Sequence, residues 1–99
     1  MTAILVPIYN AVRETTACLA ALARAIDADT EVILIDDAST DAAIAPLLDA
    51  FAASRARGRV LRNRHNLGFI GSVNRGLTAT DGDVLLLNSD TVATPGFLV

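Results

Sequence analysis

Four clusters of polar side chains, each placed directly after a short apolar stretch, contain the residue types in this sequence that suit ligand chemistry. They combine a tyrosine with amides, hydroxyls and carboxylates, all of which can contact a polar ligand. The clusters are Tyr9 and Asn10; Asp36, Asp37, Ser39, Thr40 and Asp41; His65, Asn66 and Gly68; and Asn88, Ser89, Asp90 and Thr91. Taken singly, each is also explained by a turn or a helix cap. Their shared placement after apolar stretches indicates one site.

The chemistry that suits such a set of side chains is binding of a nucleoside diphosphate together with a divalent cation. The planar ring of Tyr9 can stack on a base, and a carboxylate can accept a hydrogen bond from a base or a ribose. A second carboxylate can bind Mg²⁺ or Mn²⁺, hard cations that take oxygen ligands and share them with phosphate oxygens. We therefore expect a nucleotide site that includes a metal ion.

The elements that must position these side chains alternate between strands and helices. Short apolar or β-branched runs predict strands at 3–8, 31–36, 60–63 and 83–88. Helical spacing of apolar residues marks the segments between them: Leu19, Leu22, Ala23 and Ile26; Ile44, Leu47, Leu48 and Phe51; and, more weakly, Ile70, Val73 and Leu77. The order predicts an α/β, Rossmann-like βαβαβαβ fold, a parallel sheet with helices on both faces.

Ligands of an open parallel sheet bind beyond the carboxyl ends of its strands. Each polar cluster follows a predicted strand, so all four are expected along one edge of the sheet. Asp41 is a plausible cap for the second helix, and Gly58 and Gly82 stand where helices end and the next strand begins. The central expectation is that Tyr9, Asp37 and Asp90 converge on that edge.

Composition narrows the class of protein. A hydrophobic content of 53% with 19% charged residues excludes an intrinsically disordered chain. The net charge of -3 argues against a nucleic-acid binder, because such binding depends on neutralising phosphates. The sequence contains no lysine, which excludes a P-loop or a Schiff-base mechanism.

The sequence also carries expectations about location. It has no apolar run of about 20 residues and no signal-peptide pattern, so we expect neither a transmembrane segment nor export. The single cysteine, Cys18, cannot form an internal disulfide, and a packed, inert thiol is expected there. A cytoplasmic protein is predicted, with the inner face of a membrane as an alternative position.

Four motifs, taken together, resemble glycosyltransferase family 2, whose members have the GT-A fold. They are Val6-Pro7-Ile8-Tyr9-Asn10; Asp36-Asp37-Ala38-Ser39-Thr40-Asp41; Asn66-Leu67-Gly68-Phe69 with Asn74-Arg75-Gly76; and Leu87-Asn88-Ser89-Asp90-Thr91. Their order and spacing both match, and the resemblance covers nearly the whole chain. It implies transfer of a sugar from a nucleotide-sugar donor, UDP- or dTDP-linked, to an acceptor hydroxyl, with inversion at the anomeric carbon.

The resemblance also implies roles for individual residues. Tyr9 would stack on the nucleobase, Asp37 would accept a hydrogen bond from the base N3–H, and Asp36 would support that loop. Asp90 would bind Mg²⁺ or Mn²⁺, and Asn88 would lie near the ribose. The implied donor-binding residues are Pro7, Tyr9, Asn10, Asp36, Asp37, Asn66, Gly68, Asn74, Asn88 and Ser89, and Asp90 is the implied metal ligand.

Two departures from the family pattern limit what can be assigned. Asn88 replaces the first acid of the Asp-x-Asp motif, which leaves metal dependence open. The general base of this fold is expected beyond Val99, so no catalytic residue is assigned and residues 1–99 are expected to be the donor-binding half of a longer domain.

The acceptor, whether a saccharide, a lipid-linked group or a protein, stays open. The alternative is a non-catalytic nucleotide-binding or structural module, and self-association of the bare fragment is a further expectation.

Other readings of the sequence are weaker. A receiver domain needs its acidic pair after the first strand and a late lysine, but this chain has its pair after the second strand and no lysine. A dinucleotide-binding domain or a sugar nucleotidyltransferase needs a glycine-rich loop at residues 9–12, which contain no glycine here.

Five arginines at positions 55–64 are interpreted as a solvated face, with a role at phosphates or an anionic membrane as the alternative. A surface or ion-pair role is favoured for Arg75 over an approach to the diphosphate. His65 lacks a second metal ligand nearby.

Overall fold

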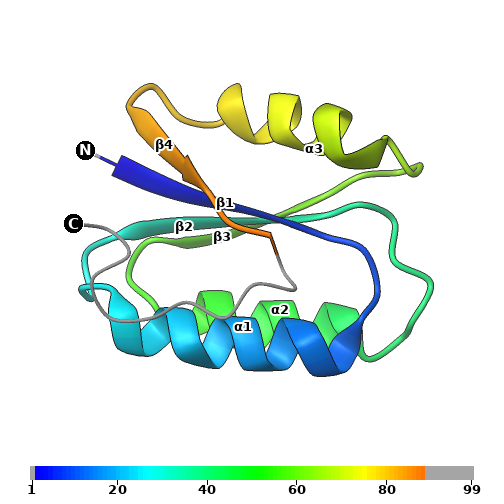
Figure 1. Cartoon of the computed structure of the whole chain (residues 1–99), viewed down its shortest axis with the longest axis horizontal. Helices are drawn as coiled ribbons and strands as arrows, with labels where there is room; N and C mark the ends of the chain where they lie inside the picture. Colours follow the sequence, from blue (N-terminus) through cyan, green and yellow to red (C-terminus); the bar gives the residue numbers. More distant parts are fainter. Residues whose placement is uncertain (1, 89–99) are drawn as a thin grey trace.

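The computed structural model describes residues 2–88, in which strands and helices alternate as the sequence predicts (Figure 1). The elements are β1 (Thr2–Ile8), α1 (Val12–Ala25), β2 (Glu31–Asp36), α2 (Ile44–Ala53), β3 (Gly58–Arg62), α3 (Gly68–Leu77) and β4 (Asp83–Leu86). The strands form one parallel sheet in the order β3-β2-β1-β4. The α/β class, the parallel pairing and the alternation of elements are therefore confirmed.

The helices cover both faces of the sheet because the chain changes direction across it. From β1 to β3 each strand is added on the same side, and α1 and α2 lie together on one face (Figure 1). The chain then returns past β2 and β1 to place β4, and α3 lies on the opposite face. Right-handed crossovers require this change of face when the direction of strand addition reverses.

The core lies mainly between the sheet and the α1–α2 layer. Residues 32–35 of the central strand β2 are fully buried, because their side chains alternate between the two covered faces. Leu19, Leu22 and Leu48 fill the α1–α2 side. A smaller cluster around Leu5, Ile33 and Ile35 lies under α3. Strands with successive apolar residues thus indicate a sheet covered on both faces.

The helical stripe predicted for 70–77 is wrong. Ile70 is 74% exposed and Leu77 is 42% exposed, whereas Ser72 and Gly76 are buried. A Cβ on Gly76 would lie 3.0 Å from Leu5 Cδ1 and 3.1 Å from Ile35 Cδ1, so α3 packs against the sheet through a small-residue face. Periodicity of large apolar residues cannot reveal a helix face that depends on close approach of the backbone.

The strand boundaries also differ slightly from the sequence-based ones. β3 begins at Gly58 and ends at Arg62, and β4 ends at Leu86 although the Leu87 N–H still donates to the Leu5 carbonyl at 2.9 Å. Gly58 is required by close approach, because a Cβ there would lie 2.6 Å from the Ala52 carbonyl oxygen. Asp41 accepts the Ala43 N–H at 2.9 Å, which caps the turn leading into α2 rather than the helix itself.

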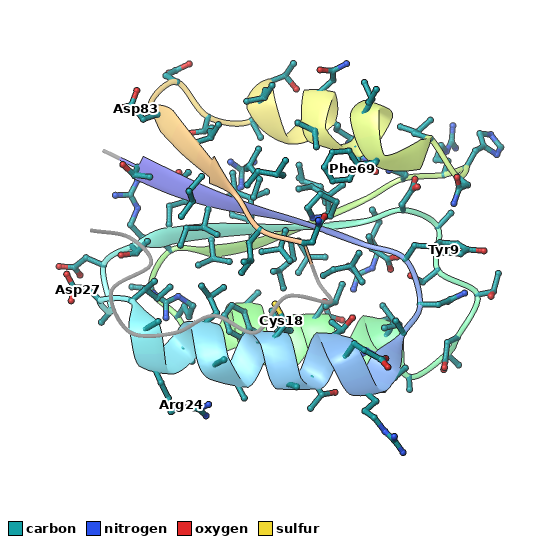
Figure 2. All side chains as sticks on the ribbon, viewed as in Figure 1. Tyr9, Cys18, Arg24, Asp27, Phe69 and Asp83 are labelled. Atoms are coloured by element: carbon teal, nitrogen blue, oxygen red, sulfur yellow. The ribbon has the colours of Figure 1, made fainter. Side chains whose placement is uncertain are left out.

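The two ends of the strands carry different side chains, as Figure 2 shows. Tyr9 lies at the carboxyl edge of the sheet, whereas Asp27 and Asp83 lie at the amino edge (Figure 2). Cys18 is buried on the side of α1 that faces the sheet, as expected for a packed thiol. Over residues 2–88, no helix is both long enough and apolar enough to cross a bilayer.

Candidate functional site

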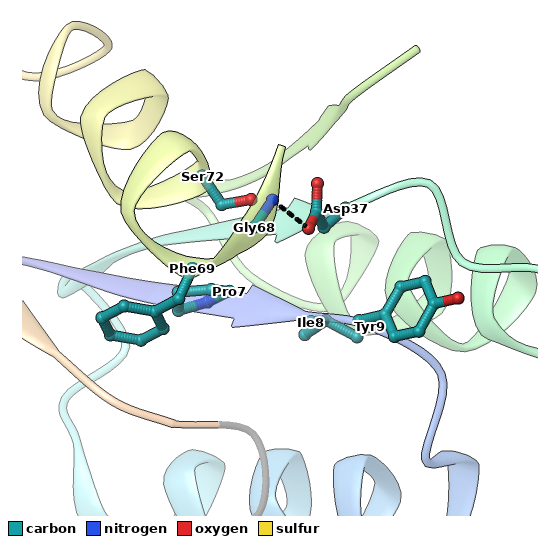
Figure 3. A pocket seen from close by; sticks show the side chains of 7 residues that line it. All are labelled: Pro7, Ile8, Tyr9, Asp37, Gly68, Phe69 and Ser72. Carbon is teal, nitrogen blue, oxygen red and sulfur yellow. Dashed lines mark hydrogen bonds between the residues drawn. The ribbon is translucent and has the colours of Figure 1, made fainter. Parts of the chain in front are cut away.

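A pocket of about 140 Å³ lies at the carboxyl edge of the sheet, where β1, β2 and α3 meet. Its lining comes from three separate segments: Pro7, Ile8 and Tyr9; Asp37; and Gly68, Phe69 and Ser72 (Figure 3). The rings of Tyr9 and Phe69 are each 50% exposed. Half-exposed aromatic rings beside a buried carboxylate form an apolar pocket with one anchored charge, a composition typical of small-molecule sites.

Asp37 is the polar centre of this pocket. Its side chain is only 5% exposed, and its backbone N–H donates to the Ile8 carbonyl at 2.8 Å, which joins the ends of β2 and β1. The Oδ1 atom accepts from Leu67 N at 2.7 Å, and Oδ2 accepts from Gly68 N at 3.0 Å. These two N–H groups begin α3 and have no partner within the helix. Asp37, which directly follows β2, therefore caps the start of α3.

The same contacts decide the ionisation of Asp37. Burial raises its pKa, but hydrogen bonds from Leu67 N, Asn63, Gly68 N and Ser72 favour the carboxylate and outweigh burial. The pKa of Asp37 is consequently lowered from its ordinary value. The pocket thus contains a carboxylate that stays charged at neutral pH.

Two further buried polar side chains support Asp37. Asn63 donates from Nδ2 to Asp37 Oδ1 at 2.8 Å and to Ser72 Oγ at 3.0 Å, and its Oδ1 accepts from Arg75 at 2.7 Å. Arg75 also donates to the Arg62 carbonyl. Arg75 is therefore held at the end of β3 by two neutral oxygen atoms, a more specific contact than the surface or ion-pair role favoured from the sequence.

Asn10 connects the loop after β1 to the loop after β2. Its Oδ1 accepts from the backbone N–H groups of Thr40 at 2.8 Å and Asp41 at 2.9 Å, and its Nδ2 donates to Thr40 Oγ1 at 3.1 Å. The Asn10 backbone N–H donates to Ser39 Oγ at 2.8 Å. Asn10 has a left-handed backbone with φ 53, a conformation that asparagine tolerates. Its polar groups are thus used to fix the loop that holds Tyr9.

Asp36 braces the second loop from its start. Its Oδ1 accepts the Ser39 N–H at 2.9 Å, and its carbonyl accepts the Asn63 N–H at 2.9 Å. The Asp36 side chain is 7% exposed and does not belong to the lining of the pocket. Its geometry is that of a loop support, the role that the family resemblance implies for it.

The segment that begins α3 contains the other predicted donor residues. Asn66 donates from Nδ2 to the Asp37 carbonyl at 3.4 Å and accepts the Gly68 N–H at 3.2 Å. Gly68 has φ 77, so only glycine adopts its backbone without strain, and it lines the pocket. Asn74 is exposed two turns further along α3 and is not among the lining residues.

The last predicted cluster is only partly described. Asn88 is exposed just after β4, and its carbonyl accepts a hydrogen bond from the Cys18 thiol at 3.6 Å. Ser89 and Asp90, the predicted donor contact and metal ligand, lie outside the described residues. Within the described part of the chain, no three histidine, cysteine or acidic side chains are grouped closely enough to bind a metal ion. The metal site stays a prediction that depends on Asp90.

Three of the arginines at positions 55–64, which lie after α2 and within β3, contact the protein itself. Arg62 pairs with Asp49 at 2.7 Å, and Arg59 donates to the Ala79 carbonyl at 2.9 Å. Arg55 donates to the Asp27 carbonyl at 2.6 Å and lies 5.9 Å from the centre of the Phe51 ring. These contacts favour the interpretation of a surface cluster over that of a phosphate site.

Three residues at this pocket, Asn63, Phe69 and Ser72, are not among the donor-binding residues that the sequence implies, although Phe69 belongs to one of the four motifs. Phe69 and Ser72 line the pocket, and Asn63 donates to both Asp37 and Ser72. Asn63 ended a predicted strand, so the rule that sites lie at carboxyl ends could have included it. Ser72 follows Gly68 by four residues, one helical turn, and so shares its face of α3.

The parallel sheet places this protein in the Rossmann-like α/β class. Its pocket lies at the carboxyl edge of the sheet, where proteins of this class bind their ligands. The chain belongs to glycosyltransferase family 2: the family model described as Glycosyl transferase family 2 matches residues 3–98. The resemblance recognised from the four motifs is thereby confirmed.

Curated relatives agree with this family. The chain is 29% identical over 93 residues to glycosyltransferase GlyG of Streptococcus pneumoniae serotype 4, covering 93% of this chain and 31% of GlyG. It is 33% identical over 90 residues to an uncharacterized glycosyltransferase of Haemophilus influenzae, covering 91% of this chain and 29% of that protein. The chain thus spans about 30% of the length of these relatives.

Solved structures confirm the fold as that of GT-A glycosyltransferases. S. aureus TarS 1-349 superposes with a TM-score of 0.82 at 27% identity, over 98% of this chain and 29% of that one. Its complex with UDP superposes with a TM-score of 0.75 at 28% identity, over 90% of this chain and 27% of that one. The mannosyltransferase PcManGT of Pyrobaculum calidifontis, in complex with GDP-Man and Mn²⁺, shares the fold with a TM-score of 0.78 at 21% identity, over 90% of this chain and 27% of that one.

Proposed function

We propose that this chain binds the nucleotide of a UDP- or dTDP-linked sugar for a glycosyltransferase that transfers the sugar to an acceptor hydroxyl. The observation that supports it is the pocket shared by Tyr9, Asp37 and Gly68, which come from three separate segments of the chain. TarS, which is 27–28% identical, has been solved in complex with UDP and with UDP-GlcNAc. Family membership supports sugar transfer, and the pocket supports the nucleotide end of the donor.

In this proposal the base lies against the aromatic rings of the pocket. Tyr9 offers a half-exposed ring beside the buried end of β1, and Phe69 offers a second half-exposed ring from the first turn of α3. A nucleobase has an apolar π-face, so stacking is favourable on either ring. The pair defines an entrance of the right chemical character for a base, and neither ring is needed to fill the core.

Asp37 would read the base through its second oxygen. A carboxylate has about four acceptor sites, two on each oxygen. Oδ1 accepts from Asn63 and Leu67, whereas Oδ2 accepts from Gly68 N. We therefore assign Oδ2 as the acceptor for a base N–H such as that of uracil or thymine.

The diphosphate would be bound by the residues that follow β4. Asn88 and Ser89 are proposed as donor contacts and Asp90 as the ligand of Mg²⁺ or Mn²⁺, which neutralises charge on the leaving diphosphate. Transfer with inversion needs a general base at the acceptor hydroxyl. The carboxylates of the pocket are committed to holding loops and the donor, so we assign this base to a part of the protein other than residues 2–88.

Calorimetric titration of the full chain with UDP and Mn²⁺ tests the proposal directly. Asp37→Asn keeps the shape of the side chain but removes its charge, and we expect UDP affinity to fall at least tenfold. Arg24→Gln, on an exposed residue in the last turn of α1, is the control and should bind as the unsubstituted chain does. Equal affinity in Asp37→Asn and the unsubstituted chain would remove Asp37 from the site.

A non-catalytic nucleotide-binding module is the second candidate function, because Asn88 stands where the family motif has an acid. The two candidates differ in turnover. A glycosyltransferase that uses a UDP-sugar releases UDP when it transfers the sugar to an acceptor. Binding of UDP without any release of UDP from a panel of UDP-sugars and acceptors would favour the module.

A further inference from the structure

A chain of three polar side chains runs from the surface of α3 to the floor of the pocket. Arg75, which is partly exposed, donates to Asn63 Oδ1 at 2.7 Å. Asn63, which is 6% exposed, donates from Nδ2 to Asp37 Oδ1 at 2.8 Å. Asp37 in turn accepts the first N–H groups of α3. The guanidinium is thus connected to the pocket carboxylate through one buried amide.

Of these three side chains, only the Asn63 amide could be rotated by a half turn, which would exchange the positions of its oxygen and nitrogen atoms. A flipped amide would place its oxygen against the Asp37 carboxylate and its NH₂ against the Arg75 guanidinium. Arginine has only donors and a carboxylate has only acceptors, so both contacts would become repulsive. The Arg75 guanidinium and the Asp37 carboxylate therefore select the same orientation of Asn63 from opposite sides.

This orientation matters for both oxygens of Asp37. With Nδ2 of Asn63 and the Leu67 N–H on Oδ1, that oxygen is fully occupied. The carboxyl group cannot rotate without breaking these bonds and the one from Gly68 N to Oδ2. Ser72, which lines the pocket, is held by the second Nδ2 proton of Asn63 at 3.0 Å. The Asn63 amide thus fixes the orientation of both the Asp37 carboxylate and the Ser72 hydroxyl in the pocket.

We infer that Arg75 and Asn63 are positioning residues of the nucleotide site. They aim the Asp37 carboxylate so that Oδ1 caps the start of α3 and Oδ2 is presented to the base. Neither residue touches the pocket itself, and the role rests on the nucleotide site proposed above. Arg75, on the third turn of α3, acts on the pocket through Asn63 and not through the diphosphate.

The test uses two substitutions at Arg75, which is not buried, so the chain should remain folded. Arg75→Met keeps the length of the side chain and removes its donors, whereas Arg75→Lys keeps a donor that can reach Asn63. Arg24→Met is the matched control, because it removes an exposed arginine from the last turn of α1. All variants are compared in the full chain by circular dichroism to verify folding.

Two readouts separate positioning from nucleotide binding. Amide hydrogen exchange of Leu67 and Gly68, followed by NMR without ligand, reports how well Asp37 holds the start of α3. Calorimetry with UDP reports the pocket. We expect Arg75→Met to speed exchange at both amides and to weaken UDP binding about tenfold, the effect of one lost charge-assisted hydrogen bond. Arg75→Lys should restore both to within about threefold, a partial rescue for a single-donor ammonium.

Distinct results would overturn different claims. Unchanged exchange of Leu67 and Gly68 in Arg75→Met would overturn the inference, because Asp37 would then be aimed without Arg75. Failure of Arg75→Lys to restore either readout would also count against it, because a cationic donor at position 75 would then not be what orients Asn63. Faster exchange with unchanged UDP affinity would support the positioning chain and contradict the proposed nucleotide site.

Discussion

The Asp37 carboxylate stabilises the start of α3, and in the proposed function it also accepts a hydrogen bond from the ligand. Internal donors reach it from Asn63, directly after β3, and from the start of α3, which keeps it charged although it is buried. A buried carboxylate without such donors would be neutral, because desolvation penalises its charged form. The chemistry of the pocket is therefore decided by hydrogen bonds to one side chain.

The lowered pKa of Asp37 predicts how stability depends on pH. A carboxyl group whose folded pKa is depressed stabilises the fold fully above its ordinary pKa of about 4. The contribution is lost as the pH falls from there through the lowered folded value. We expect Asp37→Asn to lower the free energy of unfolding at pH 7 by about 1–3 kcal/mol and to remove part of the acid dependence.

Urea denaturation of both chains between pH 7 and pH 2 measures this effect. Asp29→Asn, at an exposed position before β2, is the control and should keep the acid dependence of the unsubstituted chain. A parallel loss of stability with acid in Asp37→Asn and the unsubstituted chain would contradict the assignment.

The exposed aromatic ring of Tyr9 supports a prediction about binding alone. Tyr9→Ala should weaken UDP binding by about 1–3 kcal/mol, the usual contribution of one base–aromatic stack. Tyr9→Phe should retain most of the affinity, because the stacking face is kept. The ring is 50% exposed, so thermal stability should hardly change in either variant. Calorimetry and thermal unfolding measure the two quantities, and equal affinity for all three chains would remove Tyr9 from the base site.

At the scale of elements, the loops after β1 and β2 are fixed to each other before any ligand is present. Asn10, Ala11 and Ala38 have φ values of 53, 57 and 59, a left-handed conformation that is costly for alanine. The hydrogen bonds of Asn10 to Ser39, Thr40 and Asp41 offset this cost. Both loops border the pocket, so strained backbone lies where a ligand would be positioned.

The contact between α2 and β3 supports a prediction about packing. A Cβ on Gly58 would lie 2.6 Å from the Ala52 carbonyl oxygen and 2.8 Å from the Ala52 Cα. Backbone atoms cannot move away as a flexible side chain does, so Gly58→Ala should destabilise the fold by about 1–3 kcal/mol. Gly82→Ala is the control, since Gly82 is exposed and its φ is not positive. Urea denaturation compares the two, and equal stability would show that α2 can shift away from β3.

At the scale of the whole molecule, the sheet brings the ends of β1 and β2 together with the start of α3. The three segments lie about 30 residues apart in the sequence, as the bond from Leu67 N to Asp37 illustrates with a separation of 30. A ligand that bridges them would add contacts to those that the sheet and the hydrogen bonds of Asp37 already make between these segments. Binding should therefore stabilise the fold as a unit.

We therefore expect the thermal stability of the fold to depend on both the nucleotide and the metal ion. UDP at about 100 times its dissociation constant should stabilise the fold by about 2.7 kcal/mol, seen as a higher Tm. Chelation of divalent ions with EDTA should reduce this rise if Asp90 holds a metal at the diphosphate. Asp90→Ala should show the smaller rise with or without EDTA. A rise in Tm that ignores both EDTA and Asp90→Ala would contradict metal-assisted binding.

The amino-acid sequence by itself was enough to predict the order of elements, the parallel sheet and the edge at which the pocket lies. Those features follow from local signals: successive apolar residues in buried strands, and polar residues at strand ends. The four motifs were also sufficient for the family. Each of these properties can be recognised from residues that lie close together in the sequence, without knowledge of contacts between distant residues.

Only the tertiary structure decided how the site is held. In the folded protein, Asn10 joins the loops after β1 and β2, and Asn63 contacts Asp37. On α3, Ser72 and Gly76 are buried, whereas Ile70 and Leu77 are exposed. These outcomes depend on which side chains meet across 9 to 31 residues of sequence, and on how closely two backbones approach. Hydrogen-bond partners and close approach are properties of three-dimensional distance, and the periodicity of a sequence does not contain them.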